Sequence, residues 1–215
     1  MVSGATLSQQ ALNRRRCGMT NVTETPGSNA QRERRRRILD ATIALAEEGG
    51  FDAVQMRAVA DDADVALGTL YRYFPSKIHL LVTALGRQFE RAEEQSRTRQ
   101  VPGDTPHERV MFILGATTKA LQQQPNLTEA LTRAFMFADA SVADEIHFVG
   151  MKLTAMITRA IDGTDENREP TDEDTAIVRV ISDVWFTALM GWVTGRTTAA
   201  DVTKSVDVAV RLLLR

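Results

Sequence analysis

Apolar residues recur every three or four positions along most of the chain, which is the spacing that places them on one face of an α-helix. The first such segment begins at Ser28, with Gln31 three residues later in capping-box spacing, and Gly49 and Gly50 end it. No segment alternates apolar and polar residues as a half-buried strand does. The pattern therefore predicts an all-α fold of about nine helices without internal repeats.

Two short helices and a long one are predicted next. The short helices span 55–63 and 67–74, and a four-residue turn (64–67) connects them. Pro75 ends the second short helix, and Ser76 caps a long helix that reaches roughly Arg99. Two short helices joined by a short turn are the signature of a helix-turn-helix, whose second helix enters the major groove of DNA.

Caps and breaks divide the rest of the chain into five more predicted helices. Thr105, Pro106 and Glu108 form a capping box with proline at the first helical position, and Pro125 ends that helix. The other four are predicted from Asn126 to Phe137, from Ser141 to Ile161, from Thr171 to Gly195 and from Thr198 to the C-terminus. The acidic segment 162–170 is predicted to be a loop.

Composition is that of an ordinary soluble globular protein, with 43% hydrophobic and 25% charged residues among 215. The single cysteine, Cys17, can form neither an intramolecular disulfide nor a cysteine metal site, which fits a reducing cytoplasm. No uninterrupted apolar run approaches the roughly 18 residues of a membrane span. Arg14, Arg15 and Arg16 are not followed by the apolar segment of a secretory signal. We therefore expect a cytoplasmic protein without a cofactor, a metal or a membrane partner.

The N-terminal segment 1–27 is polar and shows no apolar periodicity, so we predict a disordered extension. Met19 is a candidate alternative translation start, because the patterned chain begins only at Ser28. Protein from the native source with its N-terminus at Met1 or Val2, as determined by mass spectrometry, would exclude that hypothesis.

Charge is unevenly distributed, although the net charge is only −2. A basic cluster stands at the start of the first helix and consists of Arg32, Arg34, Arg35, Arg36 and Arg37. Acidic residues gather instead around 162–174. A local basic cluster is the electrostatic footprint that DNA phosphates require, and a plain solvated helix face is the alternative.

The second helix of the predicted helix-turn-helix carries residues suited to DNA. Gly68 would let the backbone approach a base closely, and Thr69 can contact a thymine methyl group or a base edge. Lys77, just after the start of the long helix, can reach a phosphate. For Tyr71 and Tyr73, DNA contact and packing onto the small domain remain equally open.

The stretch VALGTLYRYFPSK (65–77) resembles the most diagnostic signature of the TetR family of bacterial repressors. The segments 38–41, 49–51 and 57–60 match that family's first two helices, so the resemblance covers about residues 30 to 85. A closer resemblance, to the actinobacterial repressors of cholesterol catabolism within this family, extends through further segments to most of the chain. These segments are 31–38, 52–60, 127–134, 137–141 and 180–185.

The resemblance implies a helix-turn-helix DNA-binding domain at 28–75 and a ligand-binding and dimerisation domain at 76–215. It places a base or phosphate contact at Arg57 and base-facing positions at Leu67, Gly68, Thr69 and Arg72. It places phosphate contacts at Tyr71, Tyr73 and Lys77, and we expect Arg34, Arg35 and Arg36 to flank the duplex in a salt-sensitive manner. Two such reading helices in a homodimer would meet a palindromic double-stranded DNA operator about one turn apart.

The resemblance also implies a helical cage around a small apolar effector, here a CoA thioester of a steroid catabolite. Candidate ligand-binding residues are Phe112, Met136, Phe137, Met151, Trp185, Phe186 and Met190, although each alone could be plain core. Arg133 and Lys119 are candidates for the polar mouth. Two apolar stripes are predicted to form a four-helix dimer interface: Ile177, Ile181, Val184 and Ala188, and then Val202, Val206, Ala209, Val210 and Leu213. Ligand is expected to shift the fourth helix and so the reading head.

Other function classes fit less well. An enzyme would need a catalytic motif, and no glycine-rich phosphate loop or nucleophile elbow is present. The histidines His79, His107 and His147 do not stand at metal-ligand spacing on one helix, and His79 is expected to be solvent-exposed. A helical acyl-CoA or lipid carrier would have no use for a reading helix. Within the regulators, a sensor of fatty acyl-CoA or of drug-like molecules remains the alternative.

Overall fold

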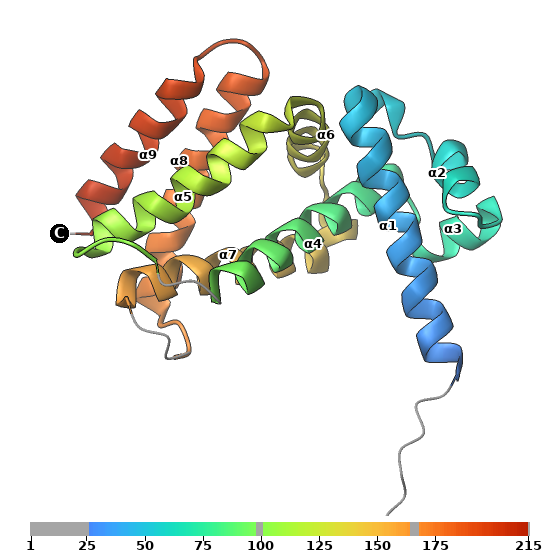
Figure 1. Ribbon diagram of the computed structural model, residues 1–215, viewed down its shortest axis with the longest axis horizontal. Coiled ribbons are helices and arrows are strands. Elements are labelled where there is room, and N and C mark those ends of the chain that lie inside the picture. Colours follow the sequence, from blue (N-terminus) through green and yellow to red (C-terminus); the bar gives the residue numbers. More distant parts are fainter. Residues whose placement is uncertain (1–25, 98–100, 164–167, 215) are drawn as a thin grey trace, which may run out of the picture. The chain divides into compact units, whose positions relative to one another are not determined.

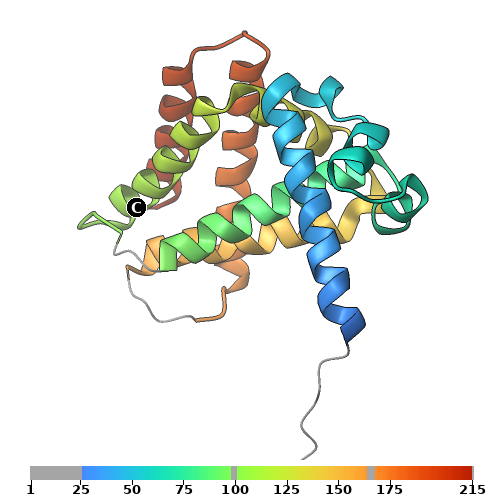
Figure 2. The same cartoon turned by 45° about the vertical axis from the view of Figure 1, so that its right-hand side comes forward.

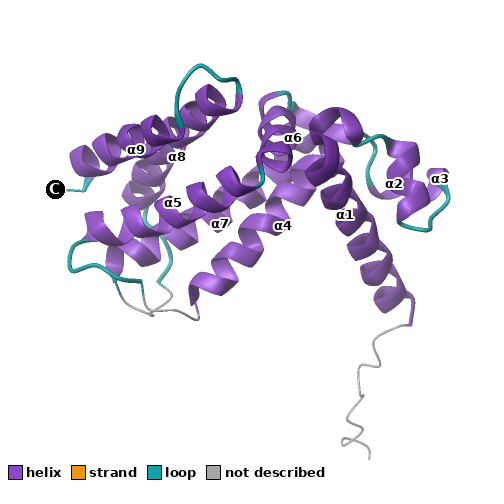
Figure 3. Cartoon of the chain, turned by 45° about the horizontal axis from the view of Figure 1, so that its top comes forward, coloured by secondary structure: helices purple, strands orange, loops and turns teal. Residues whose placement is uncertain are grey.

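The computed structural model describes residues 26–97, 101–163 and 168–214 (Figure 1). In those ranges the chain forms nine α-helices and one short 3-10 turn and no strand (Figure 3), which confirms the predicted all-α fold. The elements are α1 (Pro26–Ala53), α2 (Met56–Asp62), α3 (Leu67–Tyr73), α4 (Lys77–Arg97), α5 (Pro106–Gln123), α6 (Pro125–Met136), η1 (Ala140–Val142), α7 (Ala143–Asp162), α8 (Asp172–Val193) and α9 (Ala199–Leu213). The predicted extension 1–27 falls almost entirely outside the described residues. Contacts divide the chain into residues 1–33 and 34–215, and the packing below concerns the second unit.

Helix α1 is interrupted near its end by two glycines. Gly49 and Gly50 have non-helical backbone angles, as the sequence predicted for the helix end. Gly50 adopts φ 68°, a left-handed conformation that a residue with a Cβ adopts only at a cost, and a Cβ there would lie 2.7 Å from Oε2 of Glu129. The predicted start was wrong: the helix begins at Pro26, a residue favoured in the first helical turn, so Ser28 lies inside it.

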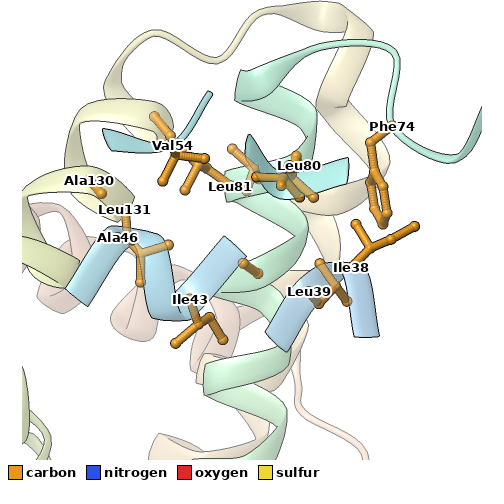
Figure 4. Close-up of a cluster of buried hydrophobic side chains, with 14 of the residues drawn as sticks. Ile38, Leu39, Ile43, Ala46, Val54, Phe74, Leu80, Leu81, Ala130 and Leu131 are labelled. Atoms are coloured by element: carbon orange, nitrogen blue, oxygen red, sulfur yellow. The ribbon is translucent and has the colours of Figure 1, made fainter. Parts of the chain in front are cut away.

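A first hydrophobic core joins the helix-turn-helix to α4 and α6 (Figure 4). Helix α2 buries Val59 and Ala60, α3 buries Leu70, and the end of the motif buries Phe74. Leu80 and Leu81 of α4 and Ala130 and Leu131 of α6 lie in the same cluster. Burial of this apolar surface is the main force holding the helix-turn-helix to these two longer helices.

A second core lies among α5, α7, α8 and α9, and α8 and α9 run side by side (Figure 1, Figure 2). Val110, Ile157, Ile181 and Val202 are among its fully buried members. The indole N–H of Trp185 donates to the Thr118 hydroxyl at 2.9 Å, which satisfies a polar group that would otherwise be costly to bury.

Three helices begin with a full capping box: the one predicted at Thr105, and two more at Thr171 and Thr198, which were predicted only as helix caps. Thr105 with Glu108, Thr171 with Asp174 and Thr198 with Asp201 each exchange side-chain and backbone hydrogen bonds at a helix start. Ser76 likewise accepts from the backbone N–H of His79 at 3.1 Å.

The predicted cap at Asn126 was wrong. Gln124 occupies the N-cap position of α6, and Pro125 takes the first helical position that suits it. The Asn126 amide instead donates to the carbonyls of Glu47 and Glu48, both at 3.1 Å, and so ties α6 to the end of α1.

Helix α8 is long and apolar enough to cross a membrane by length and composition alone, although charged and polar residues interrupt its apolar sequence. It also packs against α6, α7 and α9 and buries Val178, Ile181, Trp185 and Leu189 in the second core. These contacts are those of the central helix of a helical bundle, which passes the same test of composition.

Candidate DNA-reading helix and effector cavity

Helix α3 presents one face to solvent and buries the other. Leu67 and Tyr71 are exposed, Tyr71 by 47% of its surface, and a Cβ added at Gly68 would meet no atom within 4 Å. Leu70 faces the core and is fully buried. Thr69 is half-buried and Arg72 is exposed, so three of the four predicted base-facing positions are open to solvent.

The two tyrosines of α3 differ in their surroundings. Tyr71 is exposed, as a DNA contact requires. Tyr73 is half-buried, packs against the first core and lies 6.4 Å from the Phe74 ring. The Tyr73 ring therefore packs onto the small helical motif, which leaves only its hydroxyl as a donor to a phosphate.

The basic cluster of α1 is interleaved with acidic partners. Arg36 lies 2.8 Å from Asp40, and Arg37 lies 3.6 Å from Asp64. The Arg35 guanidinium is exposed and lies 5.6 Å from the centre of the Phe74 ring at the end of α3. Exposed pairs of this kind are weak and are screened by salt, so they contribute little to stability.

Lys77 has a second environment that the sequence did not indicate. Its Nζ lies 3.8 Å from the centre of the Phe51 ring, and the Arg133 guanidinium lies 4.4 Å from the same ring. Burial lowers the pKa of Lys77, and the nearby Arg133 adds to this effect. Arg133 also pairs with Asp52 at 3.4 Å, so it belongs to this junction and does not line the cavity described next.

An apolar cavity of about 130 Å³ lies among α4, α5, α6, α7 and α8. Two of the predicted ligand-binding residues, Trp185 and Phe186, line it. The lining set is Leu85, Phe89, Leu121, Thr128, Leu131, Thr132, Phe135, Val149, Leu153, Ser182, Asp183, Trp185, Phe186 and Leu189. Lys119, predicted at its mouth, is exposed on α5 and is not part of the wall.

The other five predicted ligand residues do not line this cavity. Four are exposed, namely Phe112, Met136, Phe137 and Met151, and Met190 is half-buried. Phe137 exposes 61% of its surface. Aromatic and methionine content alone could not tell the inner face of a helix from its outer face. Leu85 and Phe89 were not predicted, and the signal that could have found them is their helical spacing on α4.

The polar groups of the cavity wall are already hydrogen-bonded. The hydroxyls of Thr128, Thr132 and Ser182 donate to backbone carbonyls at 2.7, 2.6 and 2.7 Å, and the Trp185 indole is engaged by Thr118. Asp183 contributes the single charged side chain of the wall. The cavity therefore suits an apolar body that makes few hydrogen bonds of its own.

Two further hollows border α4. One of about 150 Å³ is also mainly apolar and shares Leu85, Phe89, Leu121 and Leu131 with the first cavity. The other, of about 370 Å³, is larger but has a charged wall, which suits an apolar effector poorly. Its charged residues are Arg35, Arg87, Glu90, Asp144 and Glu145.

The predicted dimer stripes divide between the inside and the surface of the single chain. Ile181, Val202, Val206 and Val210 are buried in the second core, so they cannot form a surface for a second copy. Their helical period was read correctly, but α8 and α9 use that face to pack within the chain. The large apolar residues that these helices expose are Val180, Val208 and Leu212. Ile177, Val184, Ala188, Ala209 and Leu213 are half-buried.

Two histidines are engaged in pairs. His79 Nε2 lies 2.7 Å from Glu145, and with 19% of its side chain exposed it is not the solvent-exposed residue that was expected. His107 Nε2 lies 2.9 Å from Asp207. Over the ranges that the structure describes, no group of three or more His, Cys, Asp or Glu side chains could hold a metal ion.

Comparison with known proteins agrees with this geometry. Residues 38–84 match the model of the bacterial regulatory proteins of the tetR family, and residues 103–213 match the tetracyclin repressor-like C-terminal domain. The chain is 55% identical over 200 residues to the HTH-type transcriptional repressor KstR of Mycolicibacterium smegmatis, covering 91% of this chain and 96% of that one. It is 57% identical over 187 residues to KstR of Rhodococcus jostii, covering 87% and 85%.

Solved structures share the fold. A TetR transcriptional regulator from a Rhodococcus species superposes with a TM-score of 0.78 at 31% identity, over 86% of this chain and 97% of that one. FadR of Thermus thermophilus, a repressor solved with lauroyl-CoA, superposes with a TM-score of 0.64 at 20% identity, over 84% and 93%. Family membership excludes the enzyme alternative, since these proteins are DNA-binding regulators. The chain belongs to the TetR family of bacterial regulatory proteins.

Proposed function

We propose that this protein is a transcriptional repressor that binds a palindromic operator as a homodimer and leaves it when an apolar effector binds. One observation carries the proposal: a single helix, α4, joins the reading head to the cavity. Its residues Leu80 and Leu81 lie in the core beneath the helix-turn-helix, whereas Leu85 and Phe89 line the cavity. A ligand that displaces the second pair acts on the helix that holds the first.

On the DNA side, the open face of α3 supports the proposed base contacts of Leu67, Gly68, Thr69 and Arg72. Arg57 on α2 is also exposed, and Arg34, Arg35 and Arg36 would add phosphate contacts. Each phosphate neutralised releases counterions, so operator affinity should fall steeply as salt rises. A carrier protein would gain nothing from an exposed helix of this kind.

For the dimer, Val180, Val208 and Leu212 give α8 and α9 an exposed apolar surface. A two-fold axis through such a surface would present two α3 helices to the two halves of a palindrome. The protein would then act in the cytoplasm, where operator DNA is found.

For the effector, we propose a CoA thioester of a steroid catabolite. The resemblance to repressors of cholesterol catabolism and the identity above 50% with KstR proteins support it. Burying a fused-ring body against this apolar wall would contribute about 25 cal/mol per Å² of apolar surface. A fatty acyl-CoA is the second candidate, because the same wall suits an acyl chain and FadR of similar fold was solved with lauroyl-CoA.

The test is a fluorescence-anisotropy titration of an operator fragment from the protein's own upstream region. Wild type is compared with Thr69→Ala and Tyr71→Ala, with Phe112→Ala as a control that also removes an exposed side chain away from DNA. Each protein is titrated alone, with a steroid-CoA thioester and with lauroyl-CoA. Ligand must favour the state that does not bind DNA for release to occur.

We expect Thr69→Ala to bind the operator roughly five- to 150-fold more weakly, at about 1–3 kcal/mol for a lost specific contact. Tyr71→Ala, which loses a phosphate contact, should weaken binding to operator and random DNA to a similar extent. The Phe112→Ala control should bind as wild type does. Release by the steroid thioester alone supports the full proposal, and release by lauroyl-CoA keeps the repressor but replaces its effector. Equal binding to operator and random DNA by wild type and both variants would refute the DNA-reading role.

A further inference from the structure

The two apolar hollows beside α4 share four lining side chains. Leu85 and Phe89 come from α4, Leu121 from α5 and Leu131 from α6. The volumes are about 130 and about 150 Å³. We call the first hollow the inner chamber, the second the outer chamber and the four shared side chains the partition.

Each chamber alone is too small for a steroid or a long acyl chain. An engineered apolar cavity of roughly 150 Å³ holds one benzene ring. Pockets for larger ligands begin at roughly 300 Å³. The two chambers approach that volume only together, and neither does so alone. A fused-ring or long-chain ligand therefore needs both chambers, and the partition must open to admit it.

The partition also divides the two hydrophobic cores. Leu131 belongs to the first core and Leu85 packs against it, whereas Phe89 and Leu121 pack against the second core. A ligand that joins the chambers must push apart side chains of the two cores. Because interiors are close-packed, such a displacement cannot be absorbed locally and must shift the helices that carry these residues.

Phe89 is the member of the partition best placed to act as a gate. It is the largest of the four, it is only partly buried, and its ring meets the Trp185 indole edge-on at 6.2 Å and 83°. Leu131, in contrast, is almost fully buried in the first core. Displacing the Phe89 ring from Trp185, together with the shift of α4 that this close-packed site requires, would connect the chambers with the least loss of packing.

We propose that Phe89 is a length gate: ligands confined to the inner chamber bind without effect, and only ligands that displace Phe89 and span both chambers release the operator. This inference rests on the proposed function, because it assumes an effector in this cavity. Release of the operator would then depend on ligand length as well as on ligand affinity. A ligand that binds the DNA-binding and the released conformations equally well does not change the population of either. Phe89 is in this sense a specificity-determining residue.

The first arm of the test uses wild-type protein and a length series of ligands. The probes are benzene, butyryl-CoA, octanoyl-CoA, lauroyl-CoA, palmitoyl-CoA and a steroid-CoA thioester. Binding is followed by the emission of Trp185, assigned with a Trp185→Phe variant, and operator affinity by anisotropy. We expect benzene to perturb Trp185 while operator affinity changes less than about twofold, and release of about tenfold or more to begin abruptly at one chain length. Release by benzene, or release that grows evenly with length, would overturn the gate.

The second arm uses variants of the gate. Phe89→Ala should bind the longest effective probe more tightly than wild type and yet lose at least about threefold of its effect on operator affinity, because the chambers are already joined. Phe89→Leu, a milder truncation, should behave in the same direction and covers the case in which Phe89→Ala does not fold. Phe112→Ala, which removes an exposed phenylalanine of α5, should match wild type.

The outcomes separate this inference from the proposed function. If no probe of any length changes the operator affinity of wild type, the effector role itself is refuted and the gate with it. If long probes release wild type but both Phe89 variants keep the wild-type ligand affinity and the wild-type degree of release, the effector role stands and the gate alone is refuted.

Discussion

Replacing Glu93 by Gln should destabilise the protein far more than a surface substitution on the same helix. Glu93 of α4 has 2% of its side chain exposed and lies 3.0 Å from Arg159 of α7, whose side chain is 9% exposed. Arg97 and Lys152 complete the cluster at 2.5 and 3.9 Å. The substitution leaves Arg159 buried without a counter-charge, which costs about 3 kcal/mol even at the low end for buried pairs.

Thermal unfolding followed by circular dichroism measures this cost. A loss of about 3 kcal/mol corresponds to a fall in Tm of roughly 6 to 12 °C for a chain of this length. Glu94→Gln is the matched control, because it makes the same change at the exposed neighbouring residue. A Tm for Glu93→Gln within about 1 °C of the Glu94→Gln control would show that the pair contributes no net stability.

The pH dependence gives an independent check on the same pair. Burial opposes ionisation of Glu93, but hydrogen bonds from Arg159 and Arg97 outweigh it and lower the pKa of this carboxyl. A lowered folded-state pKa gives stability that is present above the unfolded value of about 4.3 and is lost as pH falls through the folded value. The Tm difference between wild type and Glu93→Gln should therefore shrink below about pH 4. The double substitution Glu93→Leu with Arg159→Met should recover much of the loss, because no buried charge is left unpaired.

Three further changes test other parts of the structure. Gly50→Ala should lower the free energy of unfolding by at least about 1 kcal/mol, because the φ of Gly50 is positive and the new Cβ would meet Glu129. Gly115→Ala, in open space on α5, should raise the free energy of unfolding by up to about 1 kcal/mol, and urea unfolding compares the two variants. Hydrogen bonds from Arg168, and then from Thr171, hold the pKa of Asp174 well below its usual range, so Asp174→Asn should lower Tm near pH 7 and have little effect at the lowest pH, where wild type also loses this stability. Val208→Glu should shift the sedimentation coefficient from dimer to monomer, whereas Phe112→Glu, at a similarly exposed apolar residue, should not; an unchanged dimer would remove Val208 from the interface.

The helices could be predicted from the sequence because local chemistry determines their ends. Thr105, Thr171 and Thr198 each stand three residues before a carboxylate, and that spacing alone specifies a capping box. The prediction that Asn126 caps α6 was wrong because Pro125 suits the first helical position better. Gln124 is therefore the N-cap, and the Asn126 amide is left to donate to α1. Such a long-range partner has no local signature.

The cavity was predicted less well than the reading helix, for a physical reason. The recurrence of apolar residues every three or four positions shows that a helix has an apolar face. It does not show whether that face packs against another helix, a cavity or a second chain. Phe112 and Phe137 have the composition of a ligand pocket and are exposed, whereas Ile181 and Val206 have the spacing of an interface and are core. Only the packing of the helices against one another distinguishes these cases.

One apolar face of α4 serves two purposes, and this lets the helix couple the effector cavity to the helix-turn-helix. Its apolar stripe is continuous from Leu80 to Phe89, yet the first residues of the stripe are fully buried under the reading head and the last ones border two small chambers. A helix is stiff along its axis, so a displacement of Leu85 or Phe89 is transmitted to Leu80 and Leu81, where tight packing resists it. Beyond the cavity, the buried pair of Glu93 with Arg159 anchors α4 to α7. A ligand that displaces the partition therefore acts on α4 between two attachments, the first core at one end and the Glu93–Arg159 pair at the other. The reading head moves only if the attachment to the first core costs less to shift than the attachment to α7. Comparing ligand-induced release in wild type and Glu93→Gln measures this directly, because a weakened anchor should let α4 yield at α7 and reduce release.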